Sequence, residues 1–256
     1  MPVLRYTDRM AGPELTVVLP AFREEENLRL LLPRIHAAVR SLPIAVEVLV
    51  VDTVAPLDAT PEVCAREGVR YLSRGPTNAY ADAVRTGIVA ARGQWILFMD
   101  ADGSHAPELI PTLFARRADA DVVIASRYVD GGHTENSRVL VLMSWVVNAC
   151  YRWVLGLRVK DVSNSFKLYR AEWLRSLELR CDNFDVIEEI LYKLRVVYRA
   201  RMVEVPATFR KRMFGETKRN LVTFMLSYVA TLLRLRFSAR AAHRTRPAEG
   251  LRPGLD

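Results

Sequence analysis

Short apolar runs alternate with amphipathic segments along the first half of the chain. The runs at 15–20 and 46–51 are rich in β-branched residues and end where polar residues begin, as buried parallel strands do. Between them, apolar residues recur at helical spacing over 24–41, and acidic residues fill the first turn. Repeated strand and helix predict an α/β fold with an open, mostly parallel sheet flanked by helices. Further strands are predicted near 69–72, at 95–99 and at 121–125, and further helices after Thr60 and over 79–92.

Two long apolar segments, 139–157 and 221–236, follow in the second half. Polar residues interrupt them, and their unbroken apolar stretches are shorter than the ~20 residues that span a bilayer. We expect two amphipathic helices, and the pattern leaves open whether they pack on the domain or lie in a membrane interface. The chain then divides into an N-terminal extension (1–14), a domain (15–235) and a basic, disordered tail (236–256).

Composition narrows the class of protein. Half of the 256 residues are hydrophobic, which excludes a disordered chain. Cys64, Cys150 and Cys181 are scattered and lack CxxC spacing, so we expect neither a disulfide framework nor a zinc site. The N-terminus shows no apolar run followed by a small-residue cleavage site, which predicts no signal peptide. We therefore expect a cytoplasmic protein in a reducing compartment.

The net charge of +8 is concentrated toward the C-terminus. Nine Lys and Arg but only two Glu lie between Lys193 and Asn220. Such an excess suits nucleic acid, an anionic membrane surface or a phosphorylated ligand. No nucleic-acid recognition motif accompanies the charge, so we expect no nucleic-acid partner. The oligomeric state is left open.

Carboxylates stand where predicted strands end. Asp52 ends one strand, and Asp100 and Asp102 follow the strand at 95–99. Open α/β sheets bind ligands at this edge. Two hard oxygen ligands spaced i, i+2 suit Mg²⁺ or Mn²⁺, which take their remaining ligands from water and substrate phosphates. Acidic residues also cap the helix after a strand, and the motif alone does not decide between the two.

Seven segments together carry a resemblance to a known family. In order over roughly 15–235, the chain is similar to family 2 glycosyltransferases of the GT-A fold. Within that family it most closely resembles polyprenol-phosphate (dolichol-phosphate) mannosyltransferases and their bacterial relatives. The segments are LPAFREEENL (19–28), VVDTVAPLDAT (50–60), AVRTGIVAARGQWILFMDADGSHAPE (83–108), VIASRYVDGG (123–132), VKDVSNSFKLYR (159–170), FDVIEEILYKL (184–194) and FRKRMFGETKRN (209–220).

The resemblance assigns roles to individual residues. It implies that Asp100 and Asp102 hold the metal and the diphosphate, with Asp102 catalytic. Asp161 and Glu188 are the remaining candidate catalytic carboxylates: one would be a general base if the acceptor were a hydroxyl, whereas a phosphate acceptor needs none. Glu188 could equally be an ordinary helix surface residue. The nucleotide's base and ribose would lie against Pro20, Phe22, Glu24 and Asp52, and phosphates and acceptor against Arg127, Arg210, Arg212 and Lys218.

The function implied is metal-dependent, inverting transfer of a sugar from a GDP- or UDP-sugar to a polyprenyl phosphate, at the cytoplasmic face of a membrane that the protein contacts peripherally. Alternatives are a soluble transferase acting on a small-molecule, polysaccharide or protein hydroxyl, and an inactive nucleotide-sugar-binding relative. Two departures from the family pattern affect the donor side. Thr53 replaces the second of two adjacent aspartates in a longer loop over 52–60, and the lysine and glycines common around 73–81 are missing.

Overall fold

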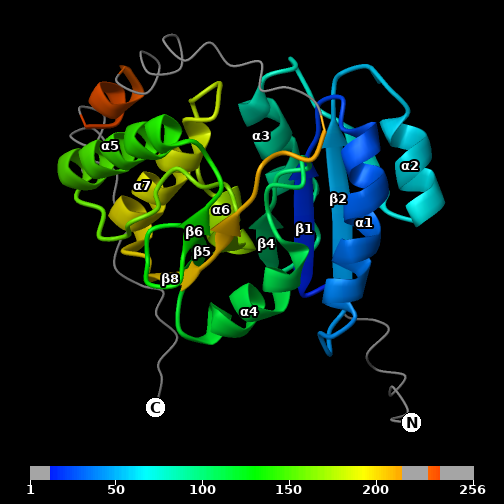
Figure 1. The fold of residues 1–256 in the computed structure, drawn as a ribbon, viewed down its shortest axis with the longest axis horizontal. Helices are drawn as coiled ribbons and strands as arrows, with labels where there is room; N and C mark the ends of the chain where they lie inside the picture. Colours follow the sequence, from blue (N-terminus) through cyan, green and yellow to red (C-terminus); the bar gives the residue numbers. More distant parts are fainter. Residues whose placement is uncertain (1–11, 215–229, 237–256) are drawn as a thin grey trace.

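A seven-stranded sheet forms the centre of the protein (Figure 1). The computed structural model describes residues 12–214 and 230–236. The strand order is β3-β2-β1-β4-β7-β5-β8, and all neighbouring pairs are parallel except those made by β7. The predicted open, mostly parallel α/β sheet is therefore confirmed. The strands are β1 (Leu15–Pro20), β2 (Val46–Asp52), β3 (Arg70–Ser73), β4 (Trp95–Phe98), β5 (Val122–Ser126), β7 (Lys167–Arg170) and β8 (Met202–Pro206).

Helices cover both faces of the sheet, and each face has its own apolar core. Leu28 and Leu32 of α1 belong to one core and Val84 of α3 to the other. Short 3-10 turns, Pro107–Leu109 and Arg116–Ala118, flank α4. One face carries α1 (Glu25–Val39), α2 (Thr60–Glu67) and α4 (Ile110–Ala115); the other carries α3 (Tyr80–Ala90), α5 (Arg138–Leu155), α6 (Ala171–Arg175) and α7 (Val186–Tyr198).

The helix predicted over 139–157 is α5, which Figure 1 shows at the periphery of the molecule. Ser137 caps its start and Gly156, at φ +66°, ends it. Val147, Asn148, Tyr151 and Leu155 are buried, but most of the apolar remainder is exposed. Within the described residues, α5 is the helix whose length and mean hydropathy (1.2) would suffice to cross a membrane.

The second predicted amphipathic segment, 221–236, is described only over 230–236, which is helical. Leu235 and Thr231 are buried there, and Arg234 donates a hydrogen bond to Cys181 Sγ at 2.7 Å. This end of the segment therefore packs on the domain. Residues 1–11 of the predicted extension, Lys218, and the predicted tail from residue 237 lie outside the described residues.

After β8 the chain crosses the carboxyl ends of the central strands. A two-stranded parallel sheet of β6 (His133–Thr134) and β9 (Thr208–Phe209) precedes this crossing. We call residues 210–214 the strap; Figure 1 shows it in orange, running from β9 toward the beginning of α1. Its backbone is fixed by bonds from Arg210 N to Ser104 O (2.9 Å) and from Met213 N to Asp102 O (3.1 Å). The strap thus covers the edge of the sheet where the sequence predicts the site.

Candidate active site

Asp100 lies just beyond the end of β4, at the centre of the sheet. Its carboxylate accepts a hydrogen bond from Ser165 Oγ at 2.8 Å, and Tyr80 Oη lies 3.5 Å from the same oxygen. Ser165 precedes the antiparallel strand β7, and Tyr80 begins α3. The side chain of Asp100 is 26% exposed. Three separate elements therefore orient a carboxylate that solvent can still reach.

The buried side chain of His105 fixes the backbone of Asp100 by a hydrogen bond. Its Nδ1 accepts a hydrogen bond from Asp100 N at 3.0 Å, so Nε2 carries the proton of the neutral ring and donates it to Asn164 Oδ1, also at 3.0 Å. The ring is 2% exposed and stacks on Phe166 at 4.8 Å. Both nitrogens are engaged, which makes His105 a positioning residue rather than a metal ligand.

Asp102 sits in a tight turn under the strap. Its Oδ1 accepts a bond from Ser104 N at 3.0 Å, and its side chain is 22% exposed. Gly103 has φ +79°, in the left-handed region that favours glycine. A Cβ built there would come within 2.4 Å of the Met213 side chain. The close approach of the strap to Asp102 therefore requires glycine at 103.

Arg212 of the strap joins Asp102 to Glu24. Its guanidinium donates to the Glu24 carboxylate, and its Nη1 lies 3.9 Å from Asp102 Oδ2. Asn27 Nδ2 also donates to Glu24, at 2.5 Å. Burial raises the pKa of Glu24 to about 7, although Arg212 opposes that shift. The structure thus brings together three of the residues that the resemblance singles out: Glu24, Asp102 and Arg212.

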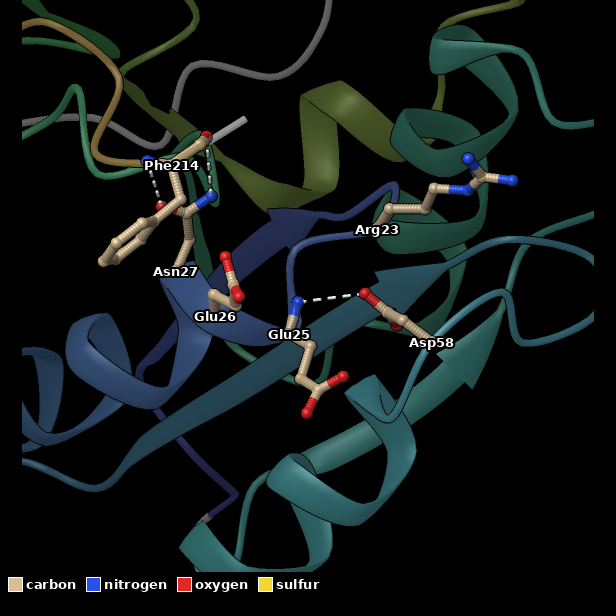
Figure 2. A pocket seen from close by; sticks show the side chains of 6 residues that line it. All are labelled: Arg23, Glu25, Glu26, Asn27, Asp58 and Phe214. Atoms are coloured by element: carbon tan, nitrogen blue, oxygen red, sulfur yellow. Dashed lines mark hydrogen bonds between the residues drawn. The ribbon is translucent and has the colours of Figure 1, made fainter. Parts of the chain in front are cut away.

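A pocket of about 220 Å³ opens where α1 begins (Figure 2). Glu25 N donates to Asp58 Oδ2 at 3.0 Å, and Asn27 exchanges hydrogen bonds with the backbone of Phe214. Carboxylates predominate in its lining, so it suits hydroxyl and N–H groups better than bare phosphates. Phe22, 42% exposed, lies in the loop that leads into α1. The lining residues are Arg23, Glu25, Glu26, Asn27, Asp58 and Phe214.

Pro20 and Asp52, the ends of β1 and β2, are both buried. Tyr71 Oη donates to Asp52 Oδ2 at 3.3 Å, and Asp52 Oδ1 has no hydrogen-bond partner among the described residues. Burial raises the pKa of Asp52. The guanidinium of Arg74, itself buried, donates to the backbone oxygens of Asp52 and Ala21. Side chains therefore cover Asp52, and a ligand would reach it only if they moved.

Arg127 and Asp161 pair with each other. Asp161 accepts bonds from Arg127 Nε and Nη2 at 2.8 and 2.7 Å and from Arg127 N at 2.9 Å. Asp161 is fully buried; burial alone would raise its pKa, but the bonds from Arg127 outweigh it and hold the pKa below its usual value. Arg127 Nη2 also donates to Ser163 Oγ at 3.0 Å. The two residues form a buried clamp that is connected to Asp100 through Asn164 and His105.

Glu188 lies inside the domain, on α7, and is 0% exposed. The alternative that it is a helix surface residue is wrong. Its charge lies near Tyr151, Tyr169 and Lys167. Burial is the largest cause of the raised pKa of both tyrosines, and the charge of Glu188 is the second. Burial lowers the pKa of Lys167 to about 8. Glu188 therefore lies among the buried residues of α7, whereas Asp100 and Asp102 follow β4 and have partly exposed side chains.

The remaining basic candidates lie on or beyond the strap. Arg210 is exposed and is tied to the turn after β4 only through its backbone. Lys218 belongs to the residues that the structure does not describe. Among the described residues of the strap, Arg212 is therefore the cation that forms an ion pair with a predicted metal-binding carboxylate, Asp102.

The residues present fit a divalent cation shared with a substrate. Among the described residues no group of three or more His, Cys, Asp and Glu could enclose a metal. Asp100 and Asp102 nevertheless present partly exposed oxygens at the end of one strand. Mg²⁺ and Mn²⁺ commonly take one or two carboxylates and complete their shell with water and phosphate oxygens. Two carboxylates leave the other coordination positions of the cation open, and water and substrate phosphates would fill them.

Residues 16–177 match the family model described as glycosyl transferase family 2. The chain belongs to glycosyl transferase family 2. It is 37% identical to an undecaprenyl-phosphate mannosyltransferase of Micrococcus luteus, over 78% of this chain and 85% of that protein. It is 34% identical to a polyprenol monophosphomannose synthase of Mycolicibacterium smegmatis, over 79% of each. The chain is thus a glycosyltransferase.

The fold is shared with solved members of the GT-A class. Glucosyl-3-phosphoglycerate synthase from Mycobacterium tuberculosis, solved with Mn²⁺, uridine diphosphate and glucosyl-3-phosphoglycerate, superposes with a TM-score of 0.67. The match covers 98% of this family 2 chain and 88% of the synthase at 21% identity, which bears on the fold alone. The predicted GT-A fold is confirmed.

The sequence did not single out several residues that shape this site. Tyr80, His105, Asn164 and Ser165 all orient Asp100 or its neighbours. Three of the four lie inside motifs that carry the resemblance, so a signal was present. Which way each side chain turns depends on contacts across the sheet, which no local pattern encodes. Arg74 had no such signal, because it lies where the family pattern breaks down.

Proposed function

We propose that this family 2 glycosyltransferase moves a sugar from a GDP- or UDP-sugar to a polyprenyl phosphate, with Mg²⁺ or Mn²⁺ held by Asp100 and Asp102. The observation that carries the proposal is the pair of partly exposed carboxylates beneath a strap that brings Arg212 to 3.9 Å from Asp102. The acceptor is supported by the names of the relatives: undecaprenyl-phosphate mannosyltransferase and polyprenol monophosphomannose synthase. The metal is supported by the Mn²⁺ in the similar synthase structure.

The donor would lie along the carboxyl ends of β1, β2 and β4. Its nucleoside fits the carboxylate-rich pocket at α1, where Glu25 and Asp58 can accept bonds from hydroxyl or N–H groups. Its diphosphate fits beside Asp100 and Asp102, where Arg212 adds a guanidinium. A divalent cation bound there supplies Lewis acidity and neutralises charge on the leaving diphosphate. The strap holds these groups in one place.

The chemistry we propose is a single displacement with inversion. An acceptor phosphate oxygen attacks the anomeric carbon, the bond from that carbon to the diphosphate oxygen breaks, and the electron pair leaves with the nucleoside diphosphate. A phosphate anion carries no proton that must be removed, so no general base is needed. The site agrees with this, because Asp161 is engaged by Arg127 and Glu188 is buried in the core.

The protein contacts a membrane from the cytoplasmic side in this proposal. Leu142 is 61% and Trp153 88% exposed on α5, and an apolar face of this kind favours the boundary between headgroups and acyl chains. Four inward residues of α5 are buried in the domain, which supports a helix that lies on the membrane rather than across it. An acceptor whose chain stays in the bilayer would meet the site at this surface.

The test is transfer to a lipid in a defined system. Purified protein is mixed with Mn²⁺, vesicles of phosphatidylcholine containing polyprenyl phosphate, and radiolabelled GDP-mannose or UDP-glucose in separate reactions. The proposal predicts label that partitions into the organic phase with one donor and that disappears when polyprenyl phosphate is omitted. Label that accumulates only on water-soluble acceptors would refute the acceptor assignment and favour a soluble transferase.

A further inference from the structure

The side chain of Asn148 is a buried amide on the inner face of α5. It is 2% exposed, whereas Leu142 and Trp153 of the same helix are largely exposed. Its Nδ2 donates a hydrogen bond to Ser144 O, one turn earlier, at 2.8 Å, and its Oδ1 accepts hydrogen bonds from the chain that follows α5. None of the segments that carry the family resemblance includes Asn148. The structure therefore adds a polar contact of α5 that the sequence did not reveal.

The α5–β7 loop, residues 156–166, joins α5 to β7 without a helix or strand. Asn148 Oδ1 accepts hydrogen bonds from the backbone nitrogens of Val162 and Ser163, at 2.7 and 3.1 Å. The two N–H groups before them donate to the carboxylate of Glu204 on β8. Buried backbone N–H groups need acceptors, and in this loop side chains supply them in place of a regular ladder. The course of the loop therefore depends on a few side chains, and Asn148 is one of them.

The α5–β7 loop also carries the groups that orient Asp100. Two residues after Ser163, the hydroxyl of Ser165 donates to Asp100 Oδ1 at 2.8 Å. Asn164, between them, accepts a hydrogen bond from His105, which in turn accepts one from the backbone nitrogen of Asp100. Two residues of chain span roughly 7 Å at most, so a displacement at Ser163 is passed on to Ser165 rather than absorbed by a long segment. The geometry of Asp100 therefore depends on where the loop is held.

Hydrogen bonds fix the position of α5 relative to this loop in a way that apolar contacts do not. Val147 and Leu155 are also buried on α5, where they pack in an apolar core. Apolar contact is non-directional, whereas a hydrogen bond weakens steeply once its length or angle departs from the optimum. Loss of the Asn148 acceptor would also leave the N–H group of Val162, a fully buried residue, without this partner. The amide therefore sets the register between the helix and the loop.

The polar atoms of Asn148 are engaged inside the domain rather than offered to a ligand. Asn148 borders a pocket of about 270 Å³ beside α5. Its Oδ1 nevertheless accepts two backbone hydrogen bonds, and its Nδ2 donates to a backbone carbonyl. These partners also fix which way the amide is turned, since two donors face the oxygen and an acceptor faces the nitrogen. Any contribution of Asn148 to the reaction is therefore made through the loop.

We propose that Asn148 is a positioning residue of this glycosyltransferase: it holds the α5–β7 loop so that Ser165 orients the carboxylate of Asp100. The inference rests on the proposed function, in which Asp100 binds the divalent cation, and adds to it a residue that touches neither cation nor substrate. The placement of α5 at the periphery thereby sets the direction of a carboxylate oxygen at the centre of the sheet.

Hydrogen exchange of the ligand-free protein tests the loop by itself. Asn148→Leu keeps a similar volume but removes both kinds of hydrogen bond. The matched control is Val147→Ala, which removes apolar contact from the adjacent buried residue of α5. Peptides that cover residues 161–166 should exchange faster in Asn148→Leu than in the parent, whereas Val147→Ala should exchange there as the parent does. Equal exchange in Asn148→Leu and the parent, or equal acceleration in both variants, would overturn the proposal.

Mn²⁺ binding, measured by electron paramagnetic resonance with GDP or UDP present, tests the effect on Asp100. Asn148→Leu should weaken Mn²⁺ binding about tenfold or more, as loss of a residue that orients a metal ligand commonly does. Asn148→Asp keeps an oxygen that accepts both loop N–H groups, so its affinity should stay within about threefold of the parent. If Asn148 acts through Ser165, the loss in the double variant with Ser165→Ala should fall well short of the product of the two single losses.

The outcomes separate this inference from the proposed function. A parent that binds no Mn²⁺ would refute the proposed metal site, while the exchange experiment needs no metal. A parent that binds Mn²⁺ together with an Asn148→Leu variant of equal affinity would overturn the role of Asn148 alone. Losses that multiply in the double variant, or an Asn148→Asp variant as weak as Asn148→Leu, would overturn it too. Should Asn148→Leu not fold, Asn148→Ser, whose shorter side chain does not reach both amides, takes its place with the same expectations.

Discussion

Replacing Asp161 with Asn should destabilise the protein more than it impairs the chemical step. The carboxylate is fully buried and accepts four hydrogen bonds of 2.7–3.2 Å, three from Arg127 and one from Asn164 N. The amide keeps the shape but removes the charge that balances Arg127. Breaking a buried pair on one side costs about 3–5 kcal/mol. At about 2–4 °C per kcal/mol, the melting temperature should fall by roughly 6–20 °C.

Circular dichroism melts and the transfer assay at a temperature well below both transitions measure the two effects separately. Adding Arg127→Met to Asp161→Asn should restore part of the stability, because the unpaired guanidinium is gone. The folded-state pKa of Asp161 is lowered, so its contribution is present above the ordinary value of 3.8 and is lost as the pH falls below it. The stability gap between parent and variant should therefore narrow in acid. A variant that melts with the parent yet transfers no sugar would refute this reasoning and make Asp161 catalytic.

Three further predictions concern the site and the membrane. His105→Phe should keep the stacking but lose both hydrogen bonds, and should lower kcat at least tenfold while the fold persists; unchanged kcat with a lower melting temperature would leave it a purely structural role. Arg212→Ala should raise the donor KM about tenfold, whereas Lys211→Ala on the same strap should not; equal effects would indicate general electrostatics. The double variant Leu142→Ser and Trp153→Ser should no longer float with anionic vesicles at low salt, because the apolar face of α5 is lost. Flotation equal to that of the parent would exclude α5 as the membrane contact.

Much of the fold could be predicted because its physical signals are local. Buried parallel strands appear in the sequence as apolar runs, and α1 and α5 appear as segments whose apolar residues recur at helical spacing. The strand β7 could not be read in this way. Its four residues, Lys167–Arg170, carry two charges, and it is a strand because it fits between β4 and β5, far away in sequence. Tertiary pairing decides such a segment, and a local pattern does not.

In the site, too, local features could be predicted from the sequence, whereas long-range pairings could not. The spacing of Asp100 and Asp102 after a strand placed them at the correct edge of the sheet, and the resemblance added Glu24 and Arg212, which the structure joins by a hydrogen bond. What could not be foreseen is which charges neutralise each other. The sequence makes Asp161 a candidate base, but the structure pairs its carboxylate with Arg127. Ion pairs between residues far apart in sequence give chemically similar carboxylates different roles: Asp161 is neutralised by Arg127 inside the domain, whereas Asp102 stays partly exposed.

The central claim is that sugar transfer depends on a divalent cation held by Asp100 and Asp102. The most direct measurement is Mn²⁺ binding by electron paramagnetic resonance in the presence of GDP or UDP, alongside transfer with and without EDTA. Asp102→Asn is compared with Asp182→Asn, which changes a carboxylate whose side chain is 78% exposed and pairs with Arg85. We predict that the parent and Asp182→Asn bind Mn²⁺ and lose transfer in EDTA, whereas Asp102→Asn folds but neither binds Mn²⁺ nor transfers sugar. Transfer that persists in EDTA, or Mn²⁺ binding unchanged in Asp102→Asn, would contradict it.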